Sequence, residues 1–347
     1  MLTRAISRIA TVVIILVIIV LAAGLGMYYE YYSPAQTRTS VSSLSVGYGG
    51  PPSCAGTTSL LLFVAEQIHA WDKYNLNVTL VNFPAGDAAS LTALSNGQIQ
   101  VDEANTETFG LELANGAPIK IFGQELIDGS WSLVVPANSS FTSVSQLKGS
   151  KITIATTSIG STVWVENQLL GKAFGLQQGT DYVDQVASSV PTGYSLLQSG
   201  KVQAIMTPIP TAISFSQRQH FPIRFLANTS QVLPKPFIER SFISTNSYLQ
   251  QNPSALVSFL NGFKDAYTYF ANNATFSDNF ISTCFGVSGS YATTIYNLML
   301  GSFFSNPFGP STVALNNVRT LGISAGVLNS TQAVPPASQW ATNITSS

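Results

Sequence analysis

Hydroxyl-bearing residues crowd a short segment between an expected strand and an expected helix. Isoleucines alternate with polar residues over 151–156, which predicts a strand, and apolar residues recur at helical spacing from Val163 to Phe174. The connecting loop offers free backbone N–H groups at the positive end of the helix dipole, which suits a small anion or a polar ligand. An ordinary strand-to-helix connection with a Ser or Thr N-cap is the alternative interpretation. The residues expected to contact a ligand here are Ser158, Gly160, Ser161 and Thr162.

A second polar run, DEANTET at 102–108, follows a short expected strand at 99–101. We interpret it as a loop that faces the first one, with Glu103, Asn105 and Thr106 as ligand contacts. A carboxylate there, Glu103 or Glu107, would pair with an amine or an aminopyrimidine. N-capping and exposure to solvent are the competing roles of these carboxylates.

Aromatic residues provide a third set of candidates. Tyr48 and Phe83 end expected strands, and Trp131 lies where the chain passes from one half to the other. Together they would suit a flat or compact apolar group, although packing in a core is the usual role of such residues. Thr207 begins a loop, TPIPT, that two prolines stiffen. It is the last expected ligand contact.

Nothing in the sequence indicates catalysis or a metal. No ligand spacing typical of a metal site occurs, and the two histidines, His69 and His220, are isolated. Cys54 has no histidine nearby in the sequence. We therefore expect no catalytic residues, no metal and no cofactor. Cys54 and Cys284 could form one disulfide in an oxidising exterior or remain two buried thiols.

These candidates must be positioned by alternating strands and helices. The order strand, helix, strand, helix predicts an α/β protein whose largely parallel sheets are covered by helices. The segment LSNGQIQ at 94–100 returns as LQSGKVQ at 197–203, each a helix end, a glycine stop and a strand start. Two similar lobes explain this repeat. We expect the chain to cross between them at 131–136 and again at 237–244.

The N-terminal residues predict how the chain is oriented in the membrane. Arg4 and Arg8 precede an uncharged apolar run at 9–27, long enough to cross a membrane as a helix. The arginines place residues 1–8 in the cytoplasm and the chain beyond a linker at 28–43 outside the cell. A cleaved signal peptide, which would leave a secreted protein, is the alternative. The exported chain would be a candidate glycoprotein, since sequons begin at Asn77, Asn138, Asn228, Asn273, Asn329 and Asn343.

Composition narrows the function. Only 9% of the 347 residues are charged and the net charge is −1, so no basic face exists to bind nucleic acid. A surface that is hydrated mainly by uncharged polar residues loses little of its hydration when carboxylates are protonated. This composition is compatible with a strongly acidic exterior.

The sequence resembles substrate-binding proteins of the nitrate, sulfonate and taurine type, a group that includes binders of thiamine pyrimidine precursors. The resemblance is carried by ALSNGQIQV at 93–101, ANGAPIKIFG at 114–123, SWSLVVP at 130–136, SQLKGSKITIA at 145–155, LLQSGKVQAI at 196–205 and QNPSALVSFLNGF at 251–263. It implies a two-lobed type II periplasmic-binding-protein fold with a ligand in the cleft. The implied first lobe spans 44–135 and 238–330 and the second 136–237, with a tail at 331–347.

The resemblance also implies a function. Such a protein would be a monomer that captures a small solute outside the cell and delivers it to an ABC permease with its ATPase. The solute would be a nitrate-, sulfonate- or taurine-like anion or an aminopyrimidine. An enzyme on the same fold and a ligand-sensing receptor are the alternatives, and we expect a binding protein and not an enzyme.

The sequence departs from the family pattern in two respects. Gln100 and Gln203 stand where the family usually has Asp, and an amide keeps the hydrogen bonding without a titrating charge. In addition, the expected cleft loops carry carboxylates but no Lys or Arg. An anion would therefore have to be held by helix N-termini and hydroxyls.

Overall fold

The computed structural model describes residues 41–345 apart from 52, 129–130 and 329–333. Ser42–Ser347 form one compact unit. The expected membrane segment at 9–27, all but the last three residues of the expected linker at 28–43, and the sequon at Asn329 lie outside the described residues. Within the described part, no helix is both long and apolar enough to span a membrane.

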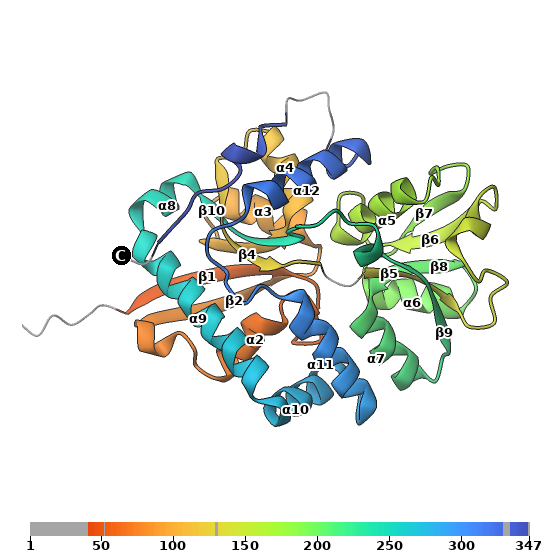
Figure 1. The fold of residues 1–347 in the computed structure, drawn as a ribbon, viewed down its shortest axis with the longest axis horizontal. Coiled ribbons are helices and arrows are strands. Elements are labelled where there is room, and N and C mark those ends of the chain that lie inside the picture. Colours follow the sequence, from red (N-terminus) through yellow and green to blue (C-terminus); the bar gives the residue numbers. More distant parts are fainter. Residues whose placement is uncertain (1–40, 52, 129–130, 329–333, 346–347) are drawn as a thin grey trace, which may run out of the picture. The chain divides into compact units, whose positions relative to one another are not determined.

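Two five-stranded sheets form the frame of this unit (Figure 1). The first has the order β2 (Leu76–Phe83), β1 (Ser42–Gly49), β3 (Val101–Asn105), β10 (Arg240–Thr245) and β4 (Ile119–Leu126). The second has the order β7 (Tyr182–Val186), β6 (Ile152–Thr156), β8 (Ala204–Pro208), β5 (Trp131–Pro136) and β9 (Ile223–Asn228). In each sheet the first three strands are parallel and the fourth is antiparallel to both its neighbours. The two sheets therefore share one topology, as the internal repeat predicts.

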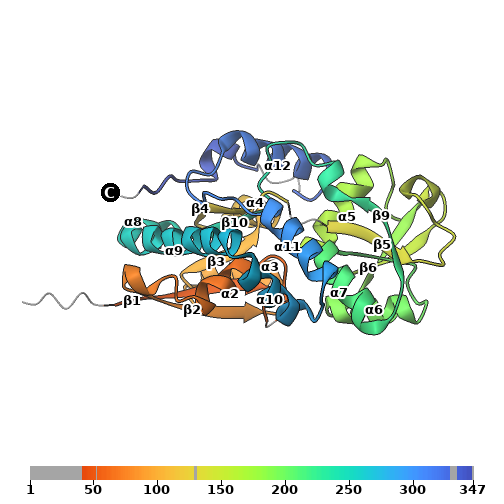
Figure 2. The ribbon, with the colours of Figure 1, turned by 60° about the horizontal axis from the view of Figure 1, so that its bottom comes forward.

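Helices surround both sheets, and we call each sheet with its helices a lobe (Figure 2). The first lobe has α2 (Leu60–Gln67), α3 (Asp87–Ser95), α4 (Thr106–Ala114), α8 (Asn246–Gln251), α9 (Pro253–Asn272), α10 (Ala274–Phe285), α11 (Ser290–Ser302) and α12 (Thr312–Ser324). The second lobe has α5 (Thr162–Ala173), α6 (Val190–Gln198) and α7 (Ile209–Gln219). Short 3-10 turns lie at Asp72–Tyr74, Val144–Leu147, Thr229–Gln231 and Ala337–Gln339.

The internal repeat places equivalent contacts in the two lobes. Gly97 and Gly200 end their helices with positive φ angles of 72° and 70°, where a glycine is the least strained residue. Gln100 Oε1 then accepts a hydrogen bond from the N–H of Ser45 at 2.9 Å, and Gln203 Oε1 accepts one from Thr153 at 2.8 Å. Each glutamine thus accepts a backbone hydrogen bond from the neighbouring strand with a group that does not titrate.

Two expectations about the elements are wrong. Residues 102–105, expected in a loop, belong to strand β3, and all of them are buried because β3 runs between β1 and β10. Residues 131–135, assigned above to the first lobe, form β5 in the second sheet. The first crossing between the lobes therefore precedes Trp131.

The expected C-terminal tail packs into the first lobe. Trp340 is fully buried and meets the ring of Phe109 edge-on at 5.7 Å. Its backbone carbonyl accepts a hydrogen bond from the N–H of Ile121 on β4. Residues 334–341 thereby cover α4 and extend the first sheet.

A tight contact between α9 and the segment after α2 fixes the other face of this lobe. Trp71 stacks on Phe259 and donates its indole N–H to the carbonyl of that residue at 3.0 Å. Gly262 lies one turn further along α9, and a Cβ there would come within 2.2 Å of the Trp71 ring.

We predict that Gly262→Ala lowers the free energy of unfolding by about 1–3 kcal/mol, because overpacking forces Trp71 or α9 to move. Gly301→Ala is the matched control, since a Cβ at this exposed position of α11 meets nothing within 4 Å. Urea unfolding of both variants measures the difference. Equal midpoints for the two variants would contradict the contact.

Candidate binding cleft

A cavity of about 710 Å³ lies between the lobes. The first lobe lines it with residues 49–51, 53, 55–58 and 84–87, Arg240 and Phe285, and the second with Trp131 and residues from 157–163, 189–198 and 208–219. Most of these residues lie in loops and helix starts that follow the carboxyl ends of strands. Ligands of open α/β sheets bind in this position.

One buried cation lies against the cavity. Arg240 on β10 is 2% exposed, and its guanidinium donates to both carboxylate oxygens of Asp87 at 3.1 and 3.0 Å. It also donates to the side chain of Glu103 and, at 2.9 Å, to the backbone carbonyl of that residue. The charge of Arg240 is therefore fully engaged by two carboxylates of its own lobe.

The second lobe joins this ion pair. The hydroxyl of Thr162, at the start of α5, donates to the Asp87 carboxylate. Burial alone would lower the pKa of Arg240, but Asp87 and Glu103 raise it well above its ordinary value. Thr162, Asp87 and Arg240 thus form a hydrogen-bonded chain from one lobe to the other along one wall of the cavity.

Three of the eleven expected ligand contacts line the cavity: Trp131, Ser161 and Thr162. Ser161 serves two roles, because its hydroxyl also accepts a hydrogen bond from the N–H of Trp164 at 3.3 Å as the N-cap of α5. The N-cap interpretation of this loop is therefore correct, and the loop nevertheless borders the cleft. The indole N–H of Trp131 donates to Glu239 at 2.7 Å.

The two other aromatic candidates pack away from the cavity. Tyr48 is 4% exposed and meets Phe63 edge-on in the core of the first lobe. Phe83 packs at the edge of another apolar cluster, which includes Phe109 of α4 and Leu169 of α5. Thr207 is buried against the hydroxyl of Tyr194 at 3.0 Å. None of these three residues lines the cavity, because their strands aim them into the cores.

The remaining candidates hold the structure behind the cleft. Asn105 caps α4 through the N–H of Thr108, and the hydroxyl of Thr106 bonds that of Ser241 on β10. Glu103 lies on β3 and pairs with Arg240. The carbonyls of Ser158 and Gly160 accept hydrogen bonds from the hydroxyls of Ser161 and Thr108. Because none of these five residues borders the cavity, the structure does not support them as ligand contacts.

Sequence reasoning missed both arginines of the cleft, Arg218 on α7 and Arg240 on β10. The search for cations covered only the expected loops, and both residues lie in regular elements. A signal was present for Arg240, since a charged pair, Glu239 and Arg240, interrupts an apolar run that was expected to cross between the lobes. Tyr194 and Phe215, which stack at 3.9 Å and line the cavity, were missed as well.

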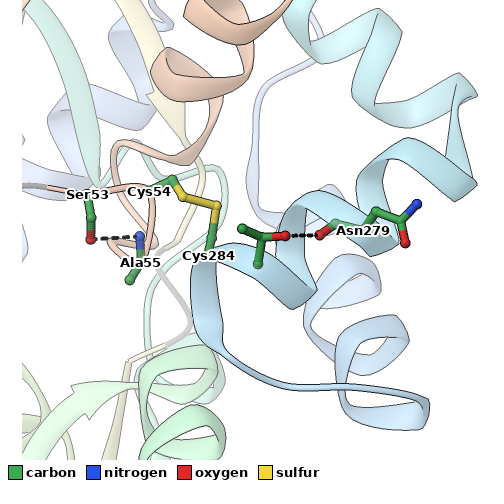
Figure 3. The surroundings of a disulfide bond; sticks show 6 residues. Ser53, Cys54, Ala55, Asn279 and Cys284 are labelled. Atoms are coloured by element: carbon green, nitrogen blue, oxygen red, sulfur yellow. Dashed lines mark hydrogen bonds between the residues drawn. A yellow bond between two sulfur atoms is a disulfide. The ribbon is translucent and has the colours of Figure 1, made fainter.

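A disulfide holds one wall of the cleft. Cys54 bonds Cys284, 230 residues later, and this ties the loop after β1 to the end of α10 (Figure 3). Both neighbours of Cys54 in that loop, Ser53 and Ala55, line the cavity, and so does Phe285. The disulfide that the sequence left open is thus formed and lies beside the site.

The sequence match covers most of the folded part. The NMT1/THI5-like family matches residues 57–275. The chain belongs to this family. No curated protein matches it.

Solved structures share the fold. The alkanesulfonate-binding protein SsuA from Xanthomonas axonopodis pv. citri, solved with MOPS, has 18% identity and a TM-score of 0.69, over 85% of this chain and 97% of that one. The Candida albicans CA3427 gene product has 18% identity and a TM-score of 0.70, over 88% and 98%. The nitrate-binding protein NrtA from Synechocystis PCC 6803 has 17% identity and a TM-score of 0.66, over 84% and 83%. The fold is therefore the two-sheet α/β fold of periplasmic binding proteins.

We predict that Cys54→Ala with Cys284→Ala lowers the free energy of unfolding by about 2–5 kcal/mol and speeds amide exchange in the loop at 53–59. Exchange mass spectrometry and urea unfolding measure the two effects. Ser53→Ala is the control, because among the described residues this exposed hydroxyl makes only a 3.4 Å contact with the N–H of Ala55. Unchanged loop exchange in the double variant would show that the disulfide does not order the wall.

We predict that Arg240→Met destabilises the protein by about 3–5 kcal/mol at pH 7, because Asp87 and Glu103 remain buried without their cation. The loss of stability should be smaller at pH 4, where Asp87 and Glu103, left without Arg240, take up protons. Arg224→Met is the control, since Arg224 donates to backbone carbonyls of Ala137, Ser139 and Phe141. Urea unfolding at both pH values measures the change in the free energy of unfolding. An equal loss of stability in Arg240→Met at pH 4 and at pH 7 would contradict the ion pair.

Proposed function

We propose that this chain is the extracytoplasmic solute-binding component of an ABC importer, and that its lobes close around a small organic solute. The cavity of about 710 Å³ between two lobes of one topology carries the proposal. Binding-protein lobes move as rigid bodies about a hinge of few residues. The fold shared with SsuA and NrtA, proteins named for binding alkanesulfonates and nitrate, supports this role.

The cavity favours an organic anion over the other expected solutes. Its volume lies within the range of sites for organic ligands and far exceeds what nitrate fills. Tyr194 and Phe215 supply an apolar wall, and Arg218 lines the same side of the cavity. Within the described part of the chain, Arg218 has no ion pair. Its guanidinium can therefore bind an anionic group, while the aromatic pair contacts the organic part.

An aminopyrimidine has weaker support. The carboxylates expected to receive its amine, Glu103 and Glu107, are fully buried outside the cavity. Asp87 does line the cavity, but both its oxygens accept hydrogen bonds from Arg240. An amine-bearing solute would have to displace that ion pair.

The other parts of the role are proposals of the same kind. The anchor at 9–27 would hold the folded unit at the outer face of the membrane, or its cleavage would release the unit. The permease would recognise the monomer in its closed form, and the ATPase would drive import. Solute capture, without turnover, is the activity proposed.

We predict that Arg218→Gln weakens binding of taurine or propanesulfonate about 10- to 100-fold, because a hydrogen-bonded charge pair contributes about 1.5–3 kcal/mol. Titration calorimetry of the full chain with these sulfonates, nitrate and an aminopyrimidine measures the affinities. Lys172→Gln, an exposed charge at the last turn of α5, is the control.

Two outcomes count against the account. Wild-type chain that binds none of these solutes in acid or at neutral pH would argue against the proposed function. A sulfonate that binds Arg218→Gln as tightly as wild type would leave the function intact and remove Arg218 from the site.

A further inference from the structure

Carboxylic acids are concentrated in the interior. Five of the eight glutamates have no exposed surface: Glu103, Glu107, Glu125, Glu166 and Glu239. Asp87 and Asp102 are buried as well, and Arg240 is the one buried cation in the described part of the chain. Glutamate is almost never fully buried unless it is paired. Most of these groups therefore cannot be balanced by the charge beside them.

Two of these glutamates come from opposite lobes. Glu107 lies in the first turn of α4, and Glu166 lies on α5, which packs against α4 and α12. The helices meet in an apolar contact, because Val165 and Leu169 of α5 are buried in one cluster with Phe109 of α4. The contact between the lobes thus encloses a carboxyl group from each side.

The surroundings of Glu166 are acidic. Three carboxylates act on Glu166 as like charges: Glu107 of α4, Glu239 of the segment before β10 and Asp128 of the crossing after β4. Within the described part of the chain, Arg240 is the one cation that acts on it. From α12, Gly322 lies beside Glu107, and Arg319 is turned to the carbonyls of Val334 and Pro335. Neither carboxylate oxygen of Glu166 has a hydrogen-bond partner within the described part of the chain.

Burial is the main cause of the raised pKa values of these glutamates. It raises the pKa of Glu107 and that of Glu239 to about 8, and that of Glu166 well above 4.5, with the neighbouring carboxylates adding to the shift for Glu166. Separation of the lobes would return water to these groups and lower the pKa values toward 4.5.

We propose that the contact between α4 and α5 is a proton-dependent latch: protonated Glu107 and Glu166 let the lobes meet, and their ionised forms drive the lobes apart. The latch regulates the cleft described above, and its physiological meaning rests on the proposed function. Capture of solute would be favoured in an acidic exterior and weakened as the pH rises.

The sign follows from the linkage between protons and contact. A carboxyl whose pKa is higher in the closed form stabilises that form. This contribution is fully present at pH values below the pKa of the open form, about 4.5. This contribution is lost as the pH rises to the closed-form pKa, about 8 for Glu107. Between these limits, each linked proton changes the ratio of closed to open protein about tenfold per pH unit.

Energy transfer between dyes on the two lobes tests the latch. Gln98→Cys and Lys201→Cys place one dye at the same exposed position of the internal repeat in each lobe, and the native cysteines stay paired. The full chain is measured without solute from pH 4 to pH 8.5, with circular dichroism as the check on folding. We expect high transfer in acid, a fall between about pH 4.5 and pH 8, and no loss of secondary structure.

The glutamine variants separate the latch from a general effect of acid. Glu166→Gln keeps the shape of the side chain without the proton, while Glu107 still titrates. Transfer at pH 8 should therefore be higher than in wild type, and the dependence of the closed-to-open ratio on pH should be weaker by about tenfold per pH unit. Glu66→Gln, at an exposed position of α2, should behave as wild type. Transfer that does not change with pH in the folded wild type, or a wild-type slope in Glu166→Gln, would overturn the proposal.

A cation could also neutralise the carboxylates. Restoration of high transfer at pH 8 by millimolar Mg²⁺ or Ca²⁺ would assign the contact to a metal and overturn the role of protons. The proposed function fails separately: if no solute of the panel raises transfer between pH 4.5 and pH 8, where the solute-free lobes are partly open, capture is refuted while the response of the solute-free chain to pH stands.

Discussion

The buried guanidinium of Arg240 is the constraint on which the arrangement of this protein depends. A charge in the interior is tolerated only with partners, and Arg240 has Asp87 from α3 and Glu103 from β3. Because Asp87 also accepts a hydrogen bond from Thr162, the pair that neutralises Arg240 reaches the second lobe. The returning strand β10, the cavity wall and the start of α5 are therefore held by one network.

The remaining buried carboxyls explain a feature of the composition. A chain with 9% charged residues nevertheless encloses most of its glutamates. In neutral solution a buried carboxyl without a cation either ionises at a cost in free energy or keeps its proton through a raised pKa. In acid the carboxyl is protonated in any case, so the cost of burying its charge does not arise. The amides of Gln100 and Gln203, which accept backbone hydrogen bonds from β1 and β6, do not titrate at all. Protonation in acid therefore removes a cost from the carboxyls without a cation, whereas it weakens the ion pairs of Arg240 with Asp87 and Glu103.

Much of the fold could be predicted from the sequence, because glycine stops and alternating apolar residues are local signals. The repeat at 94–100 and 197–203 predicted two lobes, and β6 and α5 lie within a residue of their expected bounds. The site was harder to predict. The polar run DEANTET predicts a loop, yet residues 102–105 form a buried strand. There Asp102 accepts a hydrogen bond from Ser90, and Glu103 accepts one from Arg240. Those partners are 12 and 137 residues away, so no local pattern could reveal them.

In our proposal, the contact between the lobes encloses carboxylic acids that keep their protons near neutral pH. Carbon-13 NMR of side-chain carboxyls in glutamate-labelled protein tests it directly, with the resonance of Glu107 assigned through Glu107→Gln. The account predicts that Glu107 remains protonated at pH 6 and titrates near pH 8. A Glu107 carboxyl that is ionised at pH 6 and titrates near 4.5 in the folded, closed protein would contradict it.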